Sequence, residues 1–189
     1  MDEKKLETLK DQIWSTRISR INAEKRILGK EQYIQFVNIY YSCISIIFSI
    51  MAFVNHDDKL SLLTIYMTIS LLVSIVYLTS KNYTHLARKF RDNYTDLQQL
   101  EFKLSHLTLS DEEELKNIET SYCKFLKESE NHITFDYYCT LYRSNDEYKA
   151  KKNWKSVSRS FYWGVIWRFI VKLFFVVLPI ILFLFRSFM

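Results

Sequence analysis

Five polar side chains lie on one face of an otherwise apolar segment, residues 33–54, which contains no charged residue. They are spaced three, four, three and four residues apart, so at about 100° per residue they fall within an arc of about 80° on a helix. Uncharged amides and hydroxyls form hydrogen bonds, and inside a bilayer they must face protein or water rather than lipid. The stripe predicts either packing against a neighbouring helix, which is the simpler interpretation, or the lining of a pore. Its members are Gln35, Asn38, Ser42, Ser45 and Ser49.

Residue combinations typical of enzymes are absent from the sequence. With two glycines and one proline, the chain contains no glycine-rich phosphate-binding loop of the form G-x-G-x-x-G or G-x-x-x-x-G-K. Cys123, His132 and Cys139 are conceivable metal ligands, but no C-x-x-C pair supports a metal site, and ordinary packing is favoured. His85 and His106 are isolated from any nucleophile. We therefore expect no enzyme activity, no catalytic residue, no metal, no cofactor and no direct nucleic-acid binding.

Two apolar segments are long enough to cross a membrane. Residues 33–54 and 60–80 contain no charge over 22 and 21 residues, and about 20 helical residues span a hydrocarbon core of roughly 30 Å. The polar sequence NHDDK at 55–59 connects them. Because glycine and proline are so rare, the rest of the chain favours long helices and short connections. We predict an all-α integral membrane protein built on a transmembrane helical hairpin.

Basic residues flank this hairpin at both ends. Lys and Arg avoid the translocated side of a membrane. The connecting loop has only Lys59, offset by two aspartates, so we expect loop 55–59 outside and both hairpin ends in the cytosol. We predict several passes through the membrane, with most of the polar mass in the cytosol. The flanking basic residues are Arg17, Arg20, Lys25, Arg26 and Lys30 before the hairpin, and Lys81, Arg88, Lys89 and Arg91 after it.

A third apolar segment, residues 161–189, allows two interpretations. The favoured one is a tilted third transmembrane helix with Arg168 and Lys172 in its cytosolic half. Since the uninterrupted apolar run after Lys172 is only 13 residues, the alternative is a basic amphipathic anchor whose tail enters the bilayer. The two place the C-terminus on opposite sides. Attraction to anionic lipid is expected for seven basic residues, Lys149, Lys151, Lys152, Lys155, Arg159, Arg168 and Lys172.

The polar parts of the chain are predicted to be helical. Residues 1–32 have apolar residues at three-to-four spacing, which indicates an amphipathic helix leading to the first span. Residues 81–160 form a second cytosolic helical region. Apolar residues recur there every seven positions, as in a coiled coil. We expect this seam to pair as an antiparallel stalk within the chain or to associate between subunits: Tyr83, Phe90, Leu97 and Leu104.

Three stretches of the sequence resemble the SLATT family of prokaryotic membrane-spanning effectors in anti-phage conflict systems. They are IWSTRISRINAEKRILGKEQYIQFVNIYYSCISIIFSI, SKNYTHLARKFRDNYTDLQQL and FDYYCTLYRSN, within residues 10–145. The resemblance implies a pore-forming effector of the bacterial inner membrane. Its trigger would be a sensor such as a nucleotide cyclase, a polymerase-like protein or a reverse transcriptase, or the nucleotide product. The tail from residue 149 departs from the two-span layout. The residues that carry the family pattern are Trp14, Arg17, Arg20, Arg26, Asn38, Tyr40, Tyr41 and Ser42.

Two functional hypotheses follow from these features. In the first, the chain is an oligomeric membrane-perturbing effector whose cytosolic helices hold it inactive until a signal rearranges the spans, as part of abortive infection. In the second, it is a membrane anchor that recruits a cytosolic enzyme through its stalk helices. Substitution of the polar stripe by leucine should abolish a leak in the first case and be nearly silent in the second.

Overall fold

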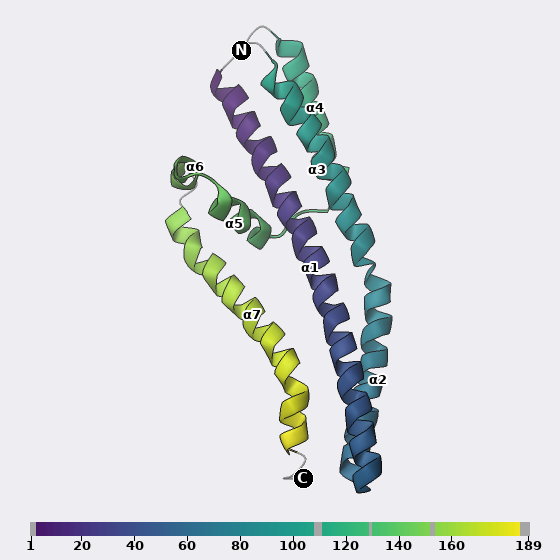
Figure 1. Cartoon of the computed structure of the whole chain (residues 1–189). Helices are drawn as coiled ribbons and strands as arrows, with labels where there is room; N and C mark the ends of the chain where they lie inside the picture. Colours follow the sequence, from purple (N-terminus) through teal and green to yellow (C-terminus); the bar gives the residue numbers. More distant parts are fainter. Residues whose placement is uncertain (1–2, 108–110, 129, 152–153, 186–189) are drawn as a thin grey trace. The chain divides into compact units, whose positions relative to one another are not determined.

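The computed structural model describes residues 3–107, 111–128, 130–151 and 154–185. Every regular element within these ranges is a helix and none is a strand, which confirms the prediction of an all-α chain (Figure 1). The helices are α1 (Glu3–Asn55), α2 (Asp58–Lys81), α3 (Tyr83–Ser105), α4 (Glu112–Glu128), α5 (Thr134–Arg143), α6 (Asp146–Lys151) and α7 (Trp154–Phe185).

The chain divides into two compact units. We call Met1–Leu28 together with Thr84–Tyr162 the polar unit, and Gly29–Tyr83 together with Trp163–Met189 the span unit. Both α1 and α7 contribute residues to each unit.

Three stretches are long and apolar enough to cross a membrane, which confirms the predicted class of membrane protein. They lie within Lys4–Asn55, Asp58–Ser105 and Val157–Phe185. Large apolar side chains along them are exposed, among them Phe53 at 80% and Ile39 at 66%. Lipid is the environment that accepts such surfaces, because it requires no hydration of apolar groups.

A short turn joins α1 to α2 in the span unit. His56 has a φ of 53°, in the left-handed region, and it directly follows the end of α1. Asp57 then caps α2, because its Oδ1 accepts a hydrogen bond from Leu60 N at 3.0 Å. This cap starts the helix at Asp58, so two residues of the predicted loop belong to α2. At the other end of α2, Asn82 closes the helix with a φ of 42°.

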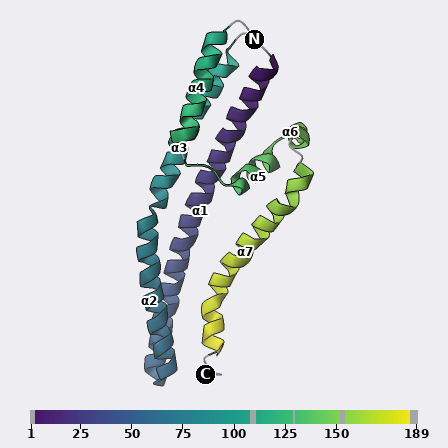
Figure 2. The ribbon, with the colours of Figure 1, turned by 180° about the vertical axis from the view of Figure 1, so that it is seen from behind.

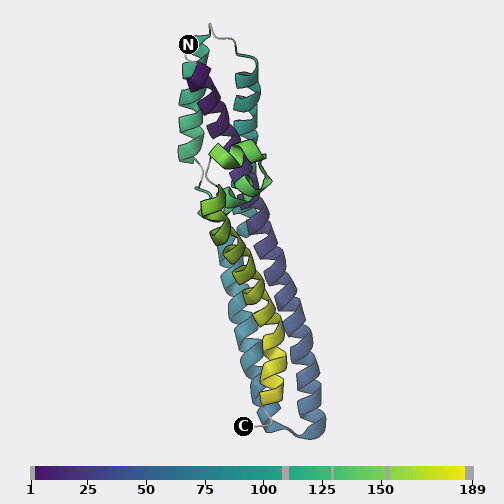
Figure 3. The same ribbon diagram turned by 90° about the vertical axis from the view of Figure 1, so that its left-hand side faces the viewer.

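A small cluster of buried apolar side chains holds α1 against α2. Their buried contacts are Phe48 and Ala52 with Leu60 and Met67, and the two helices run side by side (Figure 3). Ala52 is 4% exposed, and its lack of bulk lets the helices approach closely near the turn.

The core of the polar unit lies among α1, α3 and α4, which run side by side in this unit (Figure 2). Each helix contributes apolar residues at three-to-four spacing, so each presents one stripe to the other two. Burial of a leucine or isoleucine side chain contributes about 1.5–3 kcal/mol, so this cluster is a main source of stability for the unit. The buried members are Leu6, Leu9, Ile13, Leu97, Leu100, Leu104, Leu115 and Ile118.

Candidate functional site

The middle of the predicted polar stripe packs against α2. Ser45 is 7% exposed, and its Oγ lies 3.2 Å from Thr68 Oγ1, within hydrogen-bonding distance. At this position the stripe therefore faces protein and packs against α2.

The neighbouring serines satisfy their hydroxyls within α1 itself. Ser42 Oγ donates to the carbonyl of Asn38 at 2.8 Å, and Ser49 Oγ donates to the carbonyl of Ser45 at 2.9 Å. Both side chains are exposed. Because a serine that bonds to the preceding turn has no unmet donor, these two residues can face lipid at little cost.

The remaining members of the stripe, Gln35 and Asn38, line a groove of about 240 Å³ between α1 and α2. No described group forms a hydrogen bond with either side-chain amide. An amide in a span needs a protein or water partner, so these two residues are the part of the stripe that demands a further explanation. The other residues of the groove are Glu31, Ile75, Leu78, Thr79 and Tyr83.

Three tyrosines of α1 dock α7 in the span unit, a contact that sequence reasoning missed. Tyr33, Tyr40 and Tyr41 donate their hydroxyl groups to the carbonyls of Lys172, Val176 and Phe175, at 2.7, 3.0 and 2.7 Å. In addition, Lys172 Nζ lies 5.1 Å from the ring centre of Tyr33. These contacts provide the span unit with a third packed helix.

Pro179 explains why α7 needs such a partner. It lies inside α7 and has no backbone N–H, so the carbonyl of Phe175, four residues earlier, loses its helical donor. Tyr41 supplies the replacement from α1. The sequence did contain a signal, because a proline inside an apolar segment leaves a carbonyl without its helical donor, and two adjacent tyrosines in another segment can supply one.

The predicted seam divides between the two units. Tyr83 belongs to the span unit, where Lys30 Nζ lies 5.1 Å from its ring centre. Phe90, Leu97 and Leu104 are buried in the polar unit, and the last two belong to its core with α1 and α4. Leu97 and Leu104 therefore pack against helices of the same chain.

The predicted basic surface residues have varied surroundings. Lys155, Arg159 and Lys172 are exposed, whereas Lys149 pairs with Asp146 at 3.7 Å. Arg168 is half-buried. Lys152 lies outside the described residues, and Lys151 is described only as part of α6.

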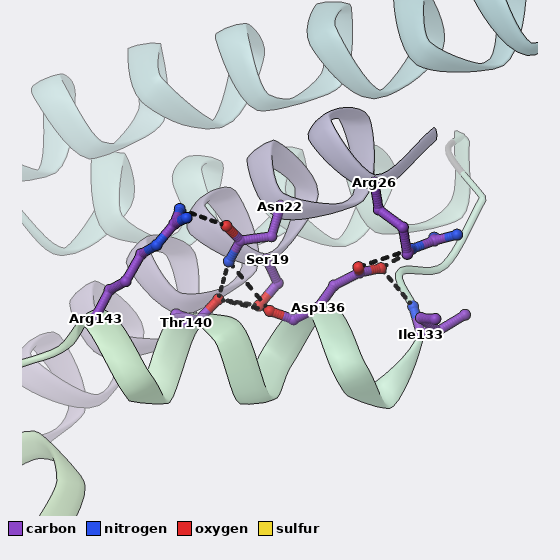
Figure 4. A network of polar contacts seen from close by, with 7 residues as sticks. All are labelled: Ser19, Asn22, Arg26, Ile133, Asp136, Thr140 and Arg143. Carbon is purple, nitrogen blue, oxygen red and sulfur yellow. Dashed lines mark hydrogen bonds and ion pairs between the residues drawn. The ribbon is translucent and has the colours of Figure 1, made fainter. Parts of the chain in front are cut away.

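A polar network joins α1 to α5 in the polar unit (Figure 4). Arg26 donates from Nε and Nη2 to the two carboxylate oxygens of Asp136, at 2.8 and 3.1 Å. Asn22 Nδ2 donates to the carbonyl of Asp136 and to Thr140 Oγ1, both at 3.1 Å. The remaining contacts are Ser19 with Thr140 at 2.9 Å, Arg143 with Asn22 at 2.9 Å, and the N–H of Ile133 with Asp136 at 3.1 Å.

Sequence periodicity gave a usable signal for this network. Ser19, Asn22 and Arg26 follow one another by three and four residues on α1, and Asp136, Thr140 and Arg143 do so on α5. Each set occupies one helix face. Each also includes charged side chains, and proteins bury such side chains only when they are paired with an opposite charge. The partner of each face could not be read from either helix alone.

The cysteine and histidine residues considered as metal ligands are dispersed. Cys123 is exposed on α4, His132 precedes α5, and Cys139 is half-buried on α5. Within the described ranges, no group of three or more His, Cys, Asp or Glu side chains could hold a metal ion.

Comparison with known proteins gives one match. A family model described as "SMODS and SLOG-associating 2TM effector domain family 5" matches residues 2–185. No curated protein and no solved structure matches the chain.

Proposed function

Because the chain belongs to the family of SMODS and SLOG-associating 2TM effector domains, we propose that it is an oligomeric, pore-forming effector of bacterial anti-phage defence. In this proposal it resides in the inner membrane with its polar unit in the cytosol, and it has no enzyme activity. Its trigger is a sensor protein, such as a nucleotide cyclase or reverse transcriptase, or the nucleotide product of that sensor.

The observation that carries the proposal is the amide-lined groove. Gln35 and Asn38 lie in a membrane-spanning segment and have no hydrogen-bond partner among the described residues. Leaving such amides unpaired in hydrocarbon costs several kcal/mol each by transfer scales, so they must meet a second subunit or water. Assembly of several copies around these residues supplies both kinds of partner. Some amides can form hydrogen bonds across the subunit interface, while others line a water-filled pore.

The chemistry of the groove predicts weak ion selectivity. Amides and hydroxyls carry no net charge, and charged rings or ordered carbonyl cages are what channels use to select ions. Among the groove residues only Glu31 is ionisable at neutral pH. A leak of this kind depolarises a membrane without favouring one small ion.

The first prediction tests the groove directly. Expression of the chain with its activating partner should depolarise cells, measured with a potential-sensitive dye. Gln35→Leu combined with Asn38→Leu should reduce the rate of depolarisation at least tenfold while membrane insertion stays normal, because the polar path is lost. Ser70→Leu with Ser74→Leu, two polar residues exposed on α2, is the matched control and should leave the leak intact. An unchanged leak in the Gln35 and Asn38 variant would refute the pore assignment.

A second groove supports the alternative function, a membrane anchor for a cytosolic enzyme. It has a volume of about 590 Å³ and lies between α3 and α4 of the polar unit. Four consecutive acidic residues, Asp111, Glu112, Glu113 and Glu114, line it together with Leu100 and Ile118. Lys103 also lines the groove, but the acidic residues outnumber it, so the groove suits a basic segment of a partner.

The anchor hypothesis predicts a loss of partner binding when this groove is neutralised. Glu113→Gln with Glu114→Gln should weaken co-purification with the activating sensor protein at least fivefold, because the charge attraction is removed. Asp92→Asn with Asp96→Asn removes the same charge from α3 away from the groove and should have no effect. Equal binding by both double variants would reject the groove as the recruiting surface.

A further inference from the structure

Three arginines of the polar unit bind carboxylates through the same edge of the guanidinium group. In Arg26, Nε and Nη2 donate to the two oxygens of Asp136 (Figure 4). These two N–H groups are parallel and coplanar, which matches the spacing of two oxygens on a carboxylate or phosphate. The same edge faces a carboxylate in the other two pairs, Arg91 with Glu24, and Arg17 with Glu101 as an ion pair 2.6 Å from Nε.

Arg20 has the same edge but no protein partner for it. Its side chain is 0% exposed, and Nη1 donates to the carbonyl of Phe125 at 3.2 Å. Among the described residues, nothing accepts a hydrogen bond from Nε or Nη2, and no carboxylate forms an ion pair with this group. Burial lowers the pKa of Arg20, and Tyr122 opposes that effect. A buried cation without an anion is destabilising, so this arrangement requires a reason.

Two more side chains with unmet polar atoms lie beside Arg20. Asn93 of α3 is 6% exposed and donates from Nδ2 to the same carbonyl of Phe125 at 2.8 Å, while its Oδ1 has no partner. His132, from the connection before α5, has an unpartnered Nδ1. It lies close enough to Arg20 for that charge to lower the pKa of His132. Residues from three segments therefore gather unused hydrogen-bonding groups at one buried place.

We propose that this cluster is a binding site for the phosphate group of a small ligand, with the Nε and Nη2 edge of Arg20 as its anchor. Two phosphate oxygens fit that edge as the carboxylate of Asp136 fits Arg26, and the negative charge neutralises the buried cation. The monoanion of a phosphate monoester also carries an O–H group, which can donate a hydrogen bond to Asn93 Oδ1. A carboxylate has no such donor, so phosphate satisfies more of the cluster.

Binding at this site requires a local opening. Arg20 has no exposed surface in this structure, so side chains packed around it must move before a ligand reaches the guanidinium. A ligand that binds only the opened state shifts the polar unit toward that state. The site does not depend on a pore, so its test is separate from the test of membrane leakage.

The experiment uses the full-length chain in nanodiscs. Thermal unfolding is measured while inorganic phosphate, adenosine monophosphate, acetate or potassium chloride is added at matched ionic strength. We expect a saturable rise in Tm with phosphate and with the monophosphate, and none with chloride. Arg20→Lys keeps the charge but loses the paired edge, so its apparent affinity should fall at least tenfold. Arg88→Lys, an exposed arginine of α3, is the matched control and should bind as the unmodified chain does.

A second variant keeps the test decisive if Arg20→Lys does not fold. Arg20→Met fills the same space without a charge, so it should be at least as stable as the unmodified chain without ligand and should not respond to phosphate. Absence of any phosphate-dependent rise in the unmodified chain would overturn the proposal. So would a normal phosphate response in Arg20→Met. An equal response to acetate would overturn the assignment to phosphate.

Discussion

At the scale of single residues, the contact between Tyr41 and Phe175 gives a testable energy. Tyr41→Phe removes a hydroxyl donor to a carbonyl that Pro179 leaves without its helical partner. We expect a loss of about 0.5–2 kcal/mol in the free energy of unfolding, measured by denaturation in detergent micelles. Tyr66→Phe, an exposed tyrosine of α2 whose hydroxyl has no hydrogen bond to a described group, should change the stability little.

A double-mutant cycle isolates the physical cause of that effect. Pro179→Ala restores a backbone N–H to α7, so the carbonyl of Phe175 regains a donor within its own helix. In that background, Tyr41→Phe should cost clearly less than it does in the unmodified chain. Equal losses in both backgrounds would mean that the tyrosine acts through packing and not through the orphaned carbonyl.

Single residues also mark the limit of what could be predicted from the sequence. The spacing of Gln35, Asn38, Ser42, Ser45 and Ser49 predicts that they share one face of a helix, and all five lie in α1. It could not separate them by surroundings, because Ser45 contacts α2 and Ser42 bonds to its own helix, whereas the two amides line a groove. These differences depend on where the neighbouring helix crosses, which periodicity within one segment does not encode.

At the scale of elements, the helices follow from local rules and their partners do not. The sequence predicts an amphipathic helix over residues 1–32 and a span over 33–54, and the described part of both lies in the single helix α1. The helix is continuous because it contains no proline and only one glycine, Gly29. No heavy atom lies within 4 Å of a Cβ added at Gly29, so close packing does not require a glycine there. The pairing of α1 with α5 through Arg26 and Asp136 joins residues 110 positions apart. Predicting such a contact requires knowing which two helix faces meet in three dimensions, and the pattern within either helix does not contain that information.

The C-terminal element illustrates the same point. The basic residues and the short apolar run left two interpretations of residues 161–189. The structure adds hydrogen bonds from three tyrosines of α1 to carbonyls of α7, and it buries Pro179. These contacts favour a helix that packs within the span unit over an amphipathic anchor lying at the membrane surface. At the surface, water can donate hydrogen bonds to backbone carbonyls, so tyrosine donors from another helix are not needed.

At the scale of the whole molecule, the two units have separate cores and can respond differently to pH. Burial, and next the charge of Arg20, lower the pKa of His132 below its ordinary value of 6.5, while Asp136 raises it. Between the lowered pKa and 6.5 the unfolded chain binds more protons than the folded one. The stability of the polar unit should therefore be complete above pH 6.5 and fall as the pH decreases below it.

Hydrogen exchange of the full chain in nanodiscs at several pH values measures this difference. Exchange rates are first corrected for the intrinsic dependence of amide exchange on pH. Below pH 6.5 the corrected rates of α5 amides should rise because the polar unit opens more often, whereas those of α2 amides should not. His132→Gln removes the buried titratable group and should abolish this pH dependence in α5. His106→Gln, at an exposed histidine directly after the end of α3, is the control and should retain it. If α5 and α2 open in parallel as the pH falls, or if His132→Gln leaves the dependence unchanged, the acid response does not originate at His132.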